Sequence, residues 1–200
     1  MPEENIHPVT DKLLDRPTKE LSLGTRAGVF WLCGLSGSGK STLASELELS
    51  LSQRDIHSIV LDGDNLRSGI NQGLGFTDED RMENIRRTAE IAKLLVRNGL
   101  VVIVSLITPL KRYRQRVAEI IGSSDYHEVF VKASFDHCQK RDVKGLYAKA
   151  AKNEIDFFTG KSSDFEEPSE PWLALDTENQ SLRQSAETLE AKVLEVISRS

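Results

Sequence analysis

The sequence predicts an α/β fold in three layers, with helices on both faces of a central, mostly parallel sheet and a mobile lid. Three observations predict it. From residue 29 onward, short apolar runs alternate with amphipathic helical patterns, which is typical of a parallel sheet covered on both faces. The glycine-rich loop 34–41 joins the first apolar run to a helical pattern. Two carboxylates, Asp62 and Asp64, follow the second run, at the strand end where open α/β sheets bind ligands.

The predicted strands and helices alternate in chain order. The strands are five apolar segments, at 29–33, 58–61, 100–106, 128–131 and 172–175. The helical patterns lie between and after them, at 42–51, around 85–96, from Pro109 through Ile121, and at about 181–198. Asn98-Gly99 is a stop signal for the second helix, and Pro109 is tolerated in the first turn of the third.

The length of 200 residues suits one compact domain spanning 1–200. Residues 1–27 are polar, contain three prolines and hold no sustained period, which predicts an arm on the surface or toward a partner subunit. Between about 141 and 171 the periodicity weakens into a run rich in Lys, Gly and Asp. This run is the predicted lid, with some helix.

Composition excludes several classes of protein. The formal net charge is -5, so the chain as a whole offers no positive field for a nucleic-acid backbone. The longest apolar run, 100–107, is far shorter than the roughly 20 residues that cross a bilayer. Cys33 and Cys138 form no CxxC pair, so we expect reduced thiols and neither a disulfide nor a zinc site. Residues 1–11 lack the features of a signal or transit peptide, so we expect a cytoplasmic protein.

The loop 34–41 fits the phosphate-binding pattern GxxxxGK[ST], with a strand before it and a helix after it. Glycines let backbone N–H groups curl around phosphate oxygens at the positive end of the helix. Lys40 then reaches the β and γ phosphates of ATP, and the Ser41 hydroxyl ligates Mg²⁺. The alternative is a glycine-rich turn before a helix. The predicted ATP-binding residues are Gly34, Leu35, Ser36, Gly37, Ser38, Gly39, Lys40, Ser41 and Thr42.

Asp62 and Asp64 say more than the phosphate loop does about which class of P-loop protein this chain is. One carboxylate can hold Mg²⁺ while another orients or deprotonates an attacking hydroxyl. We expect Asp62 to lie nearest the metal and the hydroxyl, and Asp64 to position the substrate. The alternative is an Asp-Gly turn with a helix cap at Asp64.

Longer motifs carry a family resemblance. LDGDNLRSGINQGLGF at 61–76 and DEDRMENIRR at 78–87 resemble the substrate-binding segments of adenylylsulfate kinases. The similarity extends, in the family's order, through HPVT, GLSGSGKST, SLITP, EVFV, CQKRDVKGLY and FTG. It implies transfer of the γ-phosphate of MgATP to the 3′-hydroxyl of adenosine 5′-phosphosulfate (APS), in sulfate assimilation. Family members are commonly dimers, so the resemblance also implies a homodimer. It leaves open an association with an ATP sulfurylase.

The resemblance implies roles for particular side chains. Arg67 and Arg81, with Asn84 nearby, would bind the anionic groups of APS, because guanidinium groups pair bidentately with such oxygens. Phe76 and Phe158 would hold its adenine between two rings. The remaining implied site residues are Ile107 and Thr108 in the acceptor pocket, and Arg141 and Lys144 in the lid, where they would stabilise charge on the transferring group.

Some features favour blander interpretations. The charged stretch that includes Arg86 and Arg87 is typical of a solvated helix face. Phe76 and Phe158 could equally be core residues. The charged residues of the predicted lid could be ordinary surface charges. Thr108 stands where the family has a serine linked with a covalent phosphoenzyme, so we include it among the catalytic candidates and expect direct transfer. The segment 161–166 departs from the family pattern. The other hypotheses are a P-loop kinase for a nucleoside, gluconate or shikimate-like alcohol, and a regulatory NTP-binding module.

Overall fold

The sheet confirms the predicted fold class. The computed structural model describes residue 7 and residues 9–152, 154–155 and 158–199. The strands in this part of the chain pair in parallel in the order β2-β3-β1-β4-β5. Their bounds are Gly28–Cys33 (β1), Ser58–Asp62 (β2), Val101–Ser105 (β3), Tyr126–Lys132 (β4) and Leu173–Asp176 (β5). Each contains most of its predicted segment, and the boundaries differ by one or two residues.

Two apolar layers enclose the central strand β1. Its side chains alternate between the two faces of the sheet, as strand geometry requires. Val29, Trp31 and Cys33 pack into one cluster, and Phe30 and Leu32 into the other, all with no exposed area. A strand that is buried on both faces reads in sequence as a continuous apolar run, which explains why the sequence predicted it.

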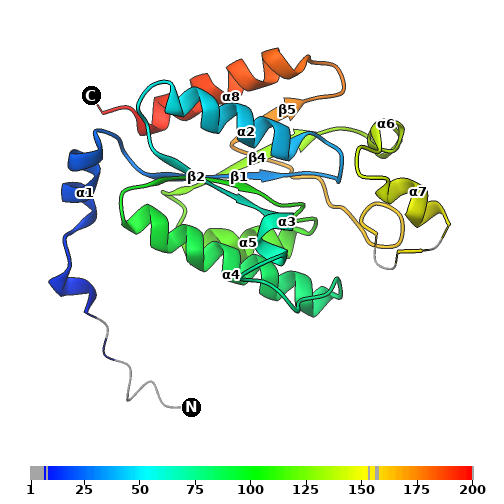
Figure 1. Cartoon of the computed structure of the whole chain (residues 1–200), viewed down its shortest axis with the longest axis horizontal. Coiled ribbons are helices and arrows are strands. Elements are labelled where there is room, and N and C mark those ends of the chain that lie inside the picture. Colours follow the sequence, from blue (N-terminus) through cyan, green and yellow to red (C-terminus); the bar gives the residue numbers. More distant parts are fainter. Residues whose placement is uncertain (1–6, 8, 153, 156–157, 200) are drawn as a thin grey trace.

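Helices cover both faces of the sheet (Figure 1). On one face lie α2 (Lys40–Ser52) and α8 (Leu182–Ile197), and on the other α4 (Asp78–Arg97) and α5 (Lys111–Ile121). The Thr77 side chain caps α4 by accepting a hydrogen bond from the Asp80 amide, at 3.2 Å. Three acidic residues in the first turn of α4 further favour the positive end of the helix dipole.

The predicted start of α5 at Pro109 is wrong. The helix begins at Lys111, because its N-cap Leu110 has an extended backbone. The Pro109 carbonyl does not enter the helix. It accepts hydrogen bonds from the Glu166 amide, at 2.9 Å, and from Arg114 Nη1, at 3.1 Å. Tertiary contacts therefore hold Pro109 in the loop before the helix.

Part of the predicted N-terminal arm is helical. Residues 1–6 and 8 lie outside the described residues, and a 3-10 turn, η2, spans Thr10–Lys12. Asp15 then caps the helix α1 (Arg16–Leu23), with a proline in its first turn. Arg16 docks this helix by pairing with Asp125 at 2.7 Å. Because α1 buries no residue, its sequence carries no apolar stripe from which the helix could be predicted.

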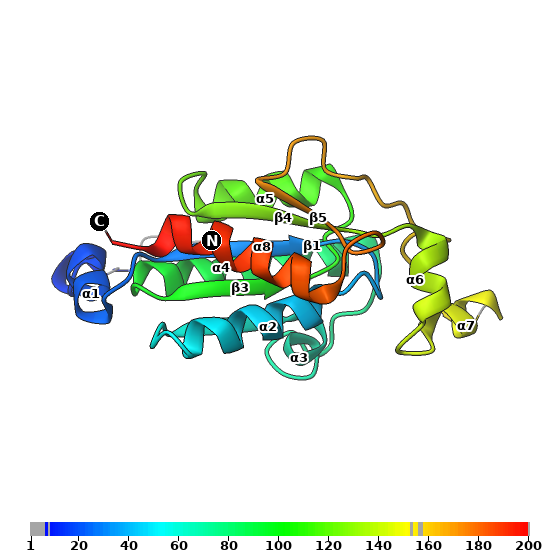
Figure 2. The same cartoon turned by 90° about the horizontal axis from the view of Figure 1, so that it is seen from above.

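Two short helices follow β4 and project at the end of the molecule opposite α1 (Figure 2). They are α6 (Phe135–Arg141) and α7 (Leu146–Ala151), and α7 confirms the helix expected in the 141–171 segment. Residues 153, 156 and 157 of that segment lie outside the described part, and its mobility stays a prediction. None of the helices in the described residues combines the length and apolarity that a membrane crossing needs.

Candidate functional site

A pocket of about 560 Å³ opens at the carboxyl ends of β1, β2 and β3. All strands run parallel, so the loops that follow them meet at this edge of the sheet. The pocket gathers most of the predicted site residues into one lining. These are Ser36, Gly37, Gly39, Lys40, Ser41, Thr42, Asp62, Asp64, Arg67, Phe76, Arg81, Asn84, Ile107, Thr108, Lys144 and Phe158.

Four predicted residues lie outside this lining. Gly34, Leu35 and Ser38 belong to the phosphate loop but face its packed side. Arg141 lies behind the loop. Its Nη2 donates to the Thr177 carbonyl at 2.5 Å, and its Nη1 to the Gly37 carbonyl at 3.3 Å. The ATP-binding roles of these residues stay predictions.

Close backbone approach explains the glycines of the phosphate loop. A Cβ atom on Gly34 would lie 2.4 Å from the Val131 carbonyl oxygen and 2.9 Å from Ser38 Oγ, so no side chain fits there. Gly37 has φ +76, and a Cβ on it would lie 3.3 Å from the Cys138 carbonyl oxygen. The loop therefore needs glycine both for space and for a left-handed backbone. It leads directly into the N-terminus of α2, which suits it to bind phosphate.

Lys40 begins α2 and is nearly fully buried beneath the loop. Its Nζ donates a hydrogen bond to the Leu35 carbonyl oxygen at 2.7 Å. Burial lowers the pKa of Lys40 from 10.5 to about 8, because the charged ammonium loses hydration. A phosphate oxygen at the loop would replace that lost hydration and favour the charged form.

A cluster of hydroxyl and carboxylate oxygens lies beside the phosphate loop. Ser41 Oγ donates to Asp62 Oδ2 at 2.7 Å and lies 3.1 Å from Ser105 Oγ. Burial would raise the pKa of Asp62, but hydrogen bonds from Ser41 and from the Asp64 amide, among others, lower it below its ordinary value. Sequence reasoning missed Ser105 as a site residue, although a serine inside the apolar run of β3 was the available signal.

Asp62, and not Asp64, caps the short helix α3 (Gly63–Arg67). The alternative helix cap at Asp64 is therefore wrong. Asp62 Oδ1 accepts a hydrogen bond from the Asp64 amide at 3.0 Å, and the Asp64 carboxylate faces the lid segment. There it accepts a hydrogen bond from Lys144 Nζ, so an ion pair joins α3 to the loop before α7.

The donor set at Ser41 and Asp62 suits Mg²⁺, which prefers hard oxygen ligands and few protein groups besides phosphate. No group of three or more His, Cys, Asp or Glu side chains in the described residues is arranged to hold a metal by itself. Mg²⁺ usually completes its coordination with water and substrate phosphate oxygens. Cys33 and Cys138 are free and buried, and burial raises the pKa of Cys33 to about 12.

Two arginines and a phenylalanine form the other side of the pocket. The Arg67 guanidinium lies 4.4 Å from the centre of the Phe76 ring and donates to the Leu74 and Gly75 carbonyls. Arg81 Nε donates to the Phe76 carbonyl at 2.9 Å. Burial lowers the pKa of both arginines, which nonetheless stay charged. This side of the pocket therefore combines two partly buried positive charges with an aromatic surface.

Thr108 has a backbone conformation that is rare for a β-branched residue. Its φ is +45, in the left-handed region. Its Oγ1 accepts a hydrogen bond from Trp31 Nε1 at 2.8 Å, and its carbonyl accepts one from the buried Arg114 at 3.1 Å. Arg114 in turn pairs with Glu128 at 3.4 Å. The Thr108 hydroxyl is thus engaged with the core, which suits a residue that shapes the pocket wall.

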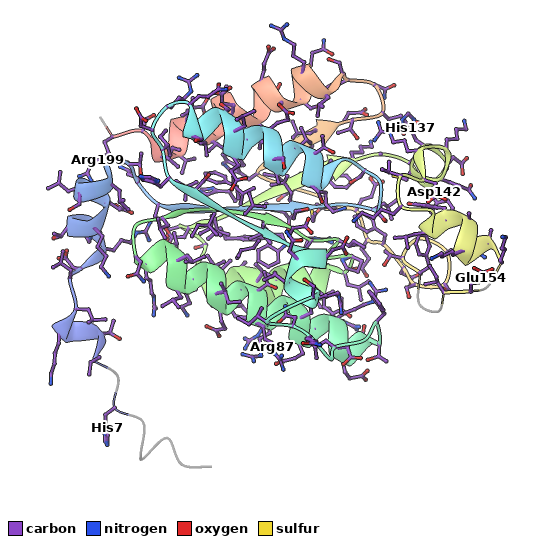
Figure 3. The ribbon with its side chains drawn as sticks, viewed as in Figure 1. His7, Arg87, His137, Asp142, Glu154 and Arg199 are labelled. Carbon is purple, nitrogen blue, oxygen red and sulfur yellow. The ribbon has the colours of Figure 1, made fainter. Side chains whose placement is uncertain are left out.

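The segment after α6 contributes to the lining of the pocket. Asp142 lies at the junction of α6 and α7 (Figure 3), and its carboxylate accepts hydrogen bonds from the Tyr147 and Ala148 amides. The Tyr147 hydroxyl donates to the Ser36 carbonyl at 2.8 Å. Phe158, only 7 % exposed, stacks edge-on against Tyr147 with ring centres 4.8 Å apart. Phe158 is therefore both a core residue and part of the pocket lining.

Comparisons with known proteins agree with this geometry. The adenylylsulphate kinase family model matches residues 26–176. An adenylyl-sulfate kinase of Phocaeicola vulgatus is 52 % identical over 199 residues, covering 100 % of this chain and 98 % of that protein. One of Bacteroides thetaiotaomicron is 50 % identical over 200 residues, covering 100 % of both. The APS kinase CysC of Mycobacterium tuberculosis, solved with AMPPNP and APS, has a TM-score of 0.81 and 40 % identity, covering 84 % of this chain and 98 % of that one. The chain belongs to the adenylylsulphate kinase family of ATP-dependent kinases, which confirms the resemblance seen in the sequence.

Proposed function

We propose that the pocket transfers the γ-phosphoryl group of MgATP to the 3′-hydroxyl of APS, giving 3′-phosphoadenosine 5′-phosphosulfate and ADP. The observation that carries the proposal is the two-sided pocket. Lys40 and the phosphate loop form one side, and Arg67, Arg81 and Phe76 form the other. A donor and an acceptor that are both anionic nucleotides need such a pair of cationic surfaces.

Asp62 lies where the two sides meet, and we assign it to the acceptor hydroxyl. The 3′-oxygen would form a bond to the γ-phosphorus as the bond between that phosphorus and the β,γ-bridging oxygen breaks. Asp62 would orient the hydroxyl and accept its proton. Its lowered pKa keeps the carboxylate ionised at neutral pH, so it can accept a hydrogen bond from the hydroxyl and bind a metal ion. Mg²⁺, when bound at Ser41 and Asp62, neutralises charge on the phosphate oxygens.

Lys40 would supply the positive charge at the β and γ phosphates, and Lys144 would supply another from the lid. In the structure, Lys144 pairs with Asp64 and so lies at the boundary between the two sides of the pocket. Arg141 would act on ATP from behind the phosphate loop, through its contacts with the Gly37 and Ser38 carbonyls. Phe76 and Phe158 would bind the adenine of APS.

Acceptor specificity tests the proposal. ADP release should be measured with APS and with a panel that includes gluconate, shikimate and nucleosides. We expect APS to give the highest kcat/KM by several orders of magnitude. Comparable turnover of a sugar acid or a nucleoside would instead support one of the other small-molecule kinases. ATP binding without turnover of any acceptor would support the regulatory module.

A pair of variants tests the division of roles between the two carboxylates. Asp62→Asn should reduce kcat by at least about 100-fold, since general-base catalysis typically contributes that much or more. Asp64→Asn should mainly raise the KM for APS. If Asp62→Asn keeps most activity while Asp64→Asn does not, the two roles must be exchanged.

We also propose a homodimer of one-domain subunits in the cytoplasm. Four exposed apolar side chains in the N-terminal segment support the dimer, because partner surfaces commonly bury such groups: Val9, Leu13, Leu14 and Leu21. Sedimentation velocity would give the mass, and a monomer at micromolar concentration would contradict this proposal. Association with an ATP sulfurylase stays a prediction, to be tested by co-sedimentation of the two proteins.

A further inference from the structure

One buried amide stands out in an exposed turn. The segment 68–77 links α3 to α4, and its side chains Ile70 and Gln72 are exposed, the former by 62 %. Asn71 between them has no exposed area. Its backbone amide donates to the Leu66 carbonyl at 2.8 Å, which fixes the turn with the Asn71 side chain directed inward.

The contact of this side chain is specific. Asn71 Nδ2 donates a hydrogen bond to Asn84 Oδ1 at 2.9 Å. Asn84 lies in the second turn of α4, is 2 % exposed and lines the pocket. A side-chain amide has one accepting end and one donating end. Because the accepting end of Asn84 is engaged with Asn71, its NH₂ group is the end left for the pocket.

The buried polar atoms support this orientation. In the described part of the chain, the buried side-chain atoms without a hydrogen-bond partner are Ser38 Oγ, Asn71 Oδ1 and His127 Nε2. Asn84 Nδ2 is not among them, and Asn84 lines the pocket. Asn71 Oδ1 is among them, and an unpaired buried oxygen destabilises a fold. An apolar side chain of the same size would avoid that penalty, so packing alone does not account for an amide here.

We propose that Asn71 is a positioning residue that holds the Asn84 amide with its NH₂ group toward the acceptor. The acceptor side of the pocket would then present donors from Arg67, Arg81 and Asn84 together. A surface that offers only hydrogen-bond donors favours an anionic group with many oxygen atoms. It disfavours a neutral alcohol, whose hydroxyl groups also need hydrogen-bond acceptors. This inference rests on the proposed function, in which the acceptor carries a phosphosulfate.

Reversing the polarity of residue 71 tests the inference. A carboxylate at this position can only accept, so Asn71→Asp should turn the Asn84 amide and present its oxygen to the pocket. We expect the Kd for APS to rise about tenfold or more, as for the loss of a hydrogen bond to a charged group. The Kd for AMPPNP should change less than about twofold. Asn71→Leu removes the donor without imposing the reverse orientation, and should raise the Kd for APS by a smaller factor, about threefold.

The matched control is Gln72→Glu. It makes the same amide-to-carboxylate change at the exposed neighbour in the same turn, so it adds the same charge without touching Asn84. We expect no change in the Kd for APS. If Gln72→Glu weakens APS binding as much as Asn71→Asp, added charge explains the effect and the inference is wrong.

A double-mutant cycle isolates the path through Asn84. In an Asn84→Ala background, Asn71→Asp and Asn71→Leu should have no further effect on the Kd for APS. An undiminished effect in that background would overturn the inference, because residue 71 would then act by distorting the turn. If Asn71→Asp does not fold by circular dichroism, the Asn71→Leu arm of the cycle gives the same decision. Wild-type protein that neither binds nor phosphorylates APS would instead overturn the proposed function.

Discussion

The burial of Lys40 in the phosphate loop predicts that this residue lowers the free energy of unfolding although turnover requires it. Folding lowers the pKa of Lys40 from 10.5 to about 8, which corresponds to about 3 kcal/mol at about 1.4 kcal/mol for each pKa unit. Lys40→Met keeps the length of the side chain and removes this penalty. It also removes the hydrogen bond to the Leu35 carbonyl, a net loss of about 1 kcal/mol. The variant should therefore be more stable than the wild type by about 2 kcal/mol at pH 7, while turnover is abolished.

The same pKa shift makes the free energy of unfolding of the wild type depend on pH. Between pH 8 and 10.5 the unfolded chain holds a proton on Lys40 that the folded chain has lost, so the stability of the wild type rises with pH in that window. The advantage of Lys40→Met should accordingly shrink by about 2 kcal/mol or more from pH 7 to pH 10. Other groups titrate in both proteins and cancel in the difference.

Urea unfolding at pH 7 and pH 10 measures both quantities, with ADP release from MgATP and APS as the activity assay. Lys149→Met, at an exposed position on α7, is the matched control. It should change the free energy of unfolding by no more than about 0.5 kcal/mol and leave its pH dependence unchanged. A Lys40→Met protein that is less stable than the wild type at both pH values would refute the reasoning, because Lys40 would then be a packing residue.

Three further predictions follow from packing and burial. Phe76→Ala and Phe158→Ala should each weaken APS binding by about 1–3 kcal/mol, and only the buried Phe158 change should also lower the free energy of unfolding. Calorimetry and urea unfolding test this, and equal losses for AMPPNP and APS would contradict an acceptor site. Thr108→Ala should reduce kcat/KM by less than about tenfold, or about 1.4 kcal/mol, because the Thr108 hydroxyl already bonds to Trp31. Trapping of ³²P on Thr108 from γ-labelled ATP, with near-complete loss of activity, would show a nucleophile instead. Burial lowers the pKa of His127, so stability should fall as the pH drops below about 6.5, and His127→Phe should remove that part of the pH dependence of unfolding.

The central sheet and the phosphate loop were predictable from sequence because their determinants are local or periodic. A strand such as β1, buried on both faces, appears as an apolar run, and the loop carries glycines whose spacing follows from steric need at Gly34 and Gly37. The carboxylates after β2 were also predictable, since parallel strands bring their ends to a common edge.

Other features depend on contacts between distant residues and left no pattern to detect. Thr108 meets Trp31 across 77 positions, and the ion pair of Arg114 with Glu128 supports that wall from the core. The displaced start of α5 depends on the contact of the Pro109 carbonyl with Glu166, which lies in the segment that departs from the family pattern. For the start of α5, tertiary structure overrode a reasonable local interpretation.

The segment 142–147 touches both halves of the pocket, and this has a thermodynamic consequence. Tyr147 bonds to the phosphate-loop carbonyl of Ser36, and Lys144 pairs with Asp64 on the acceptor side. A nucleotide that rearranges either contact alters the free energy of the other through the few residues between them. Linkage then requires that each nucleotide change the affinity of its neighbour by the same factor. The coupling between donor and acceptor is measurable as the ratio of APS dissociation constants with and without AMPPNP.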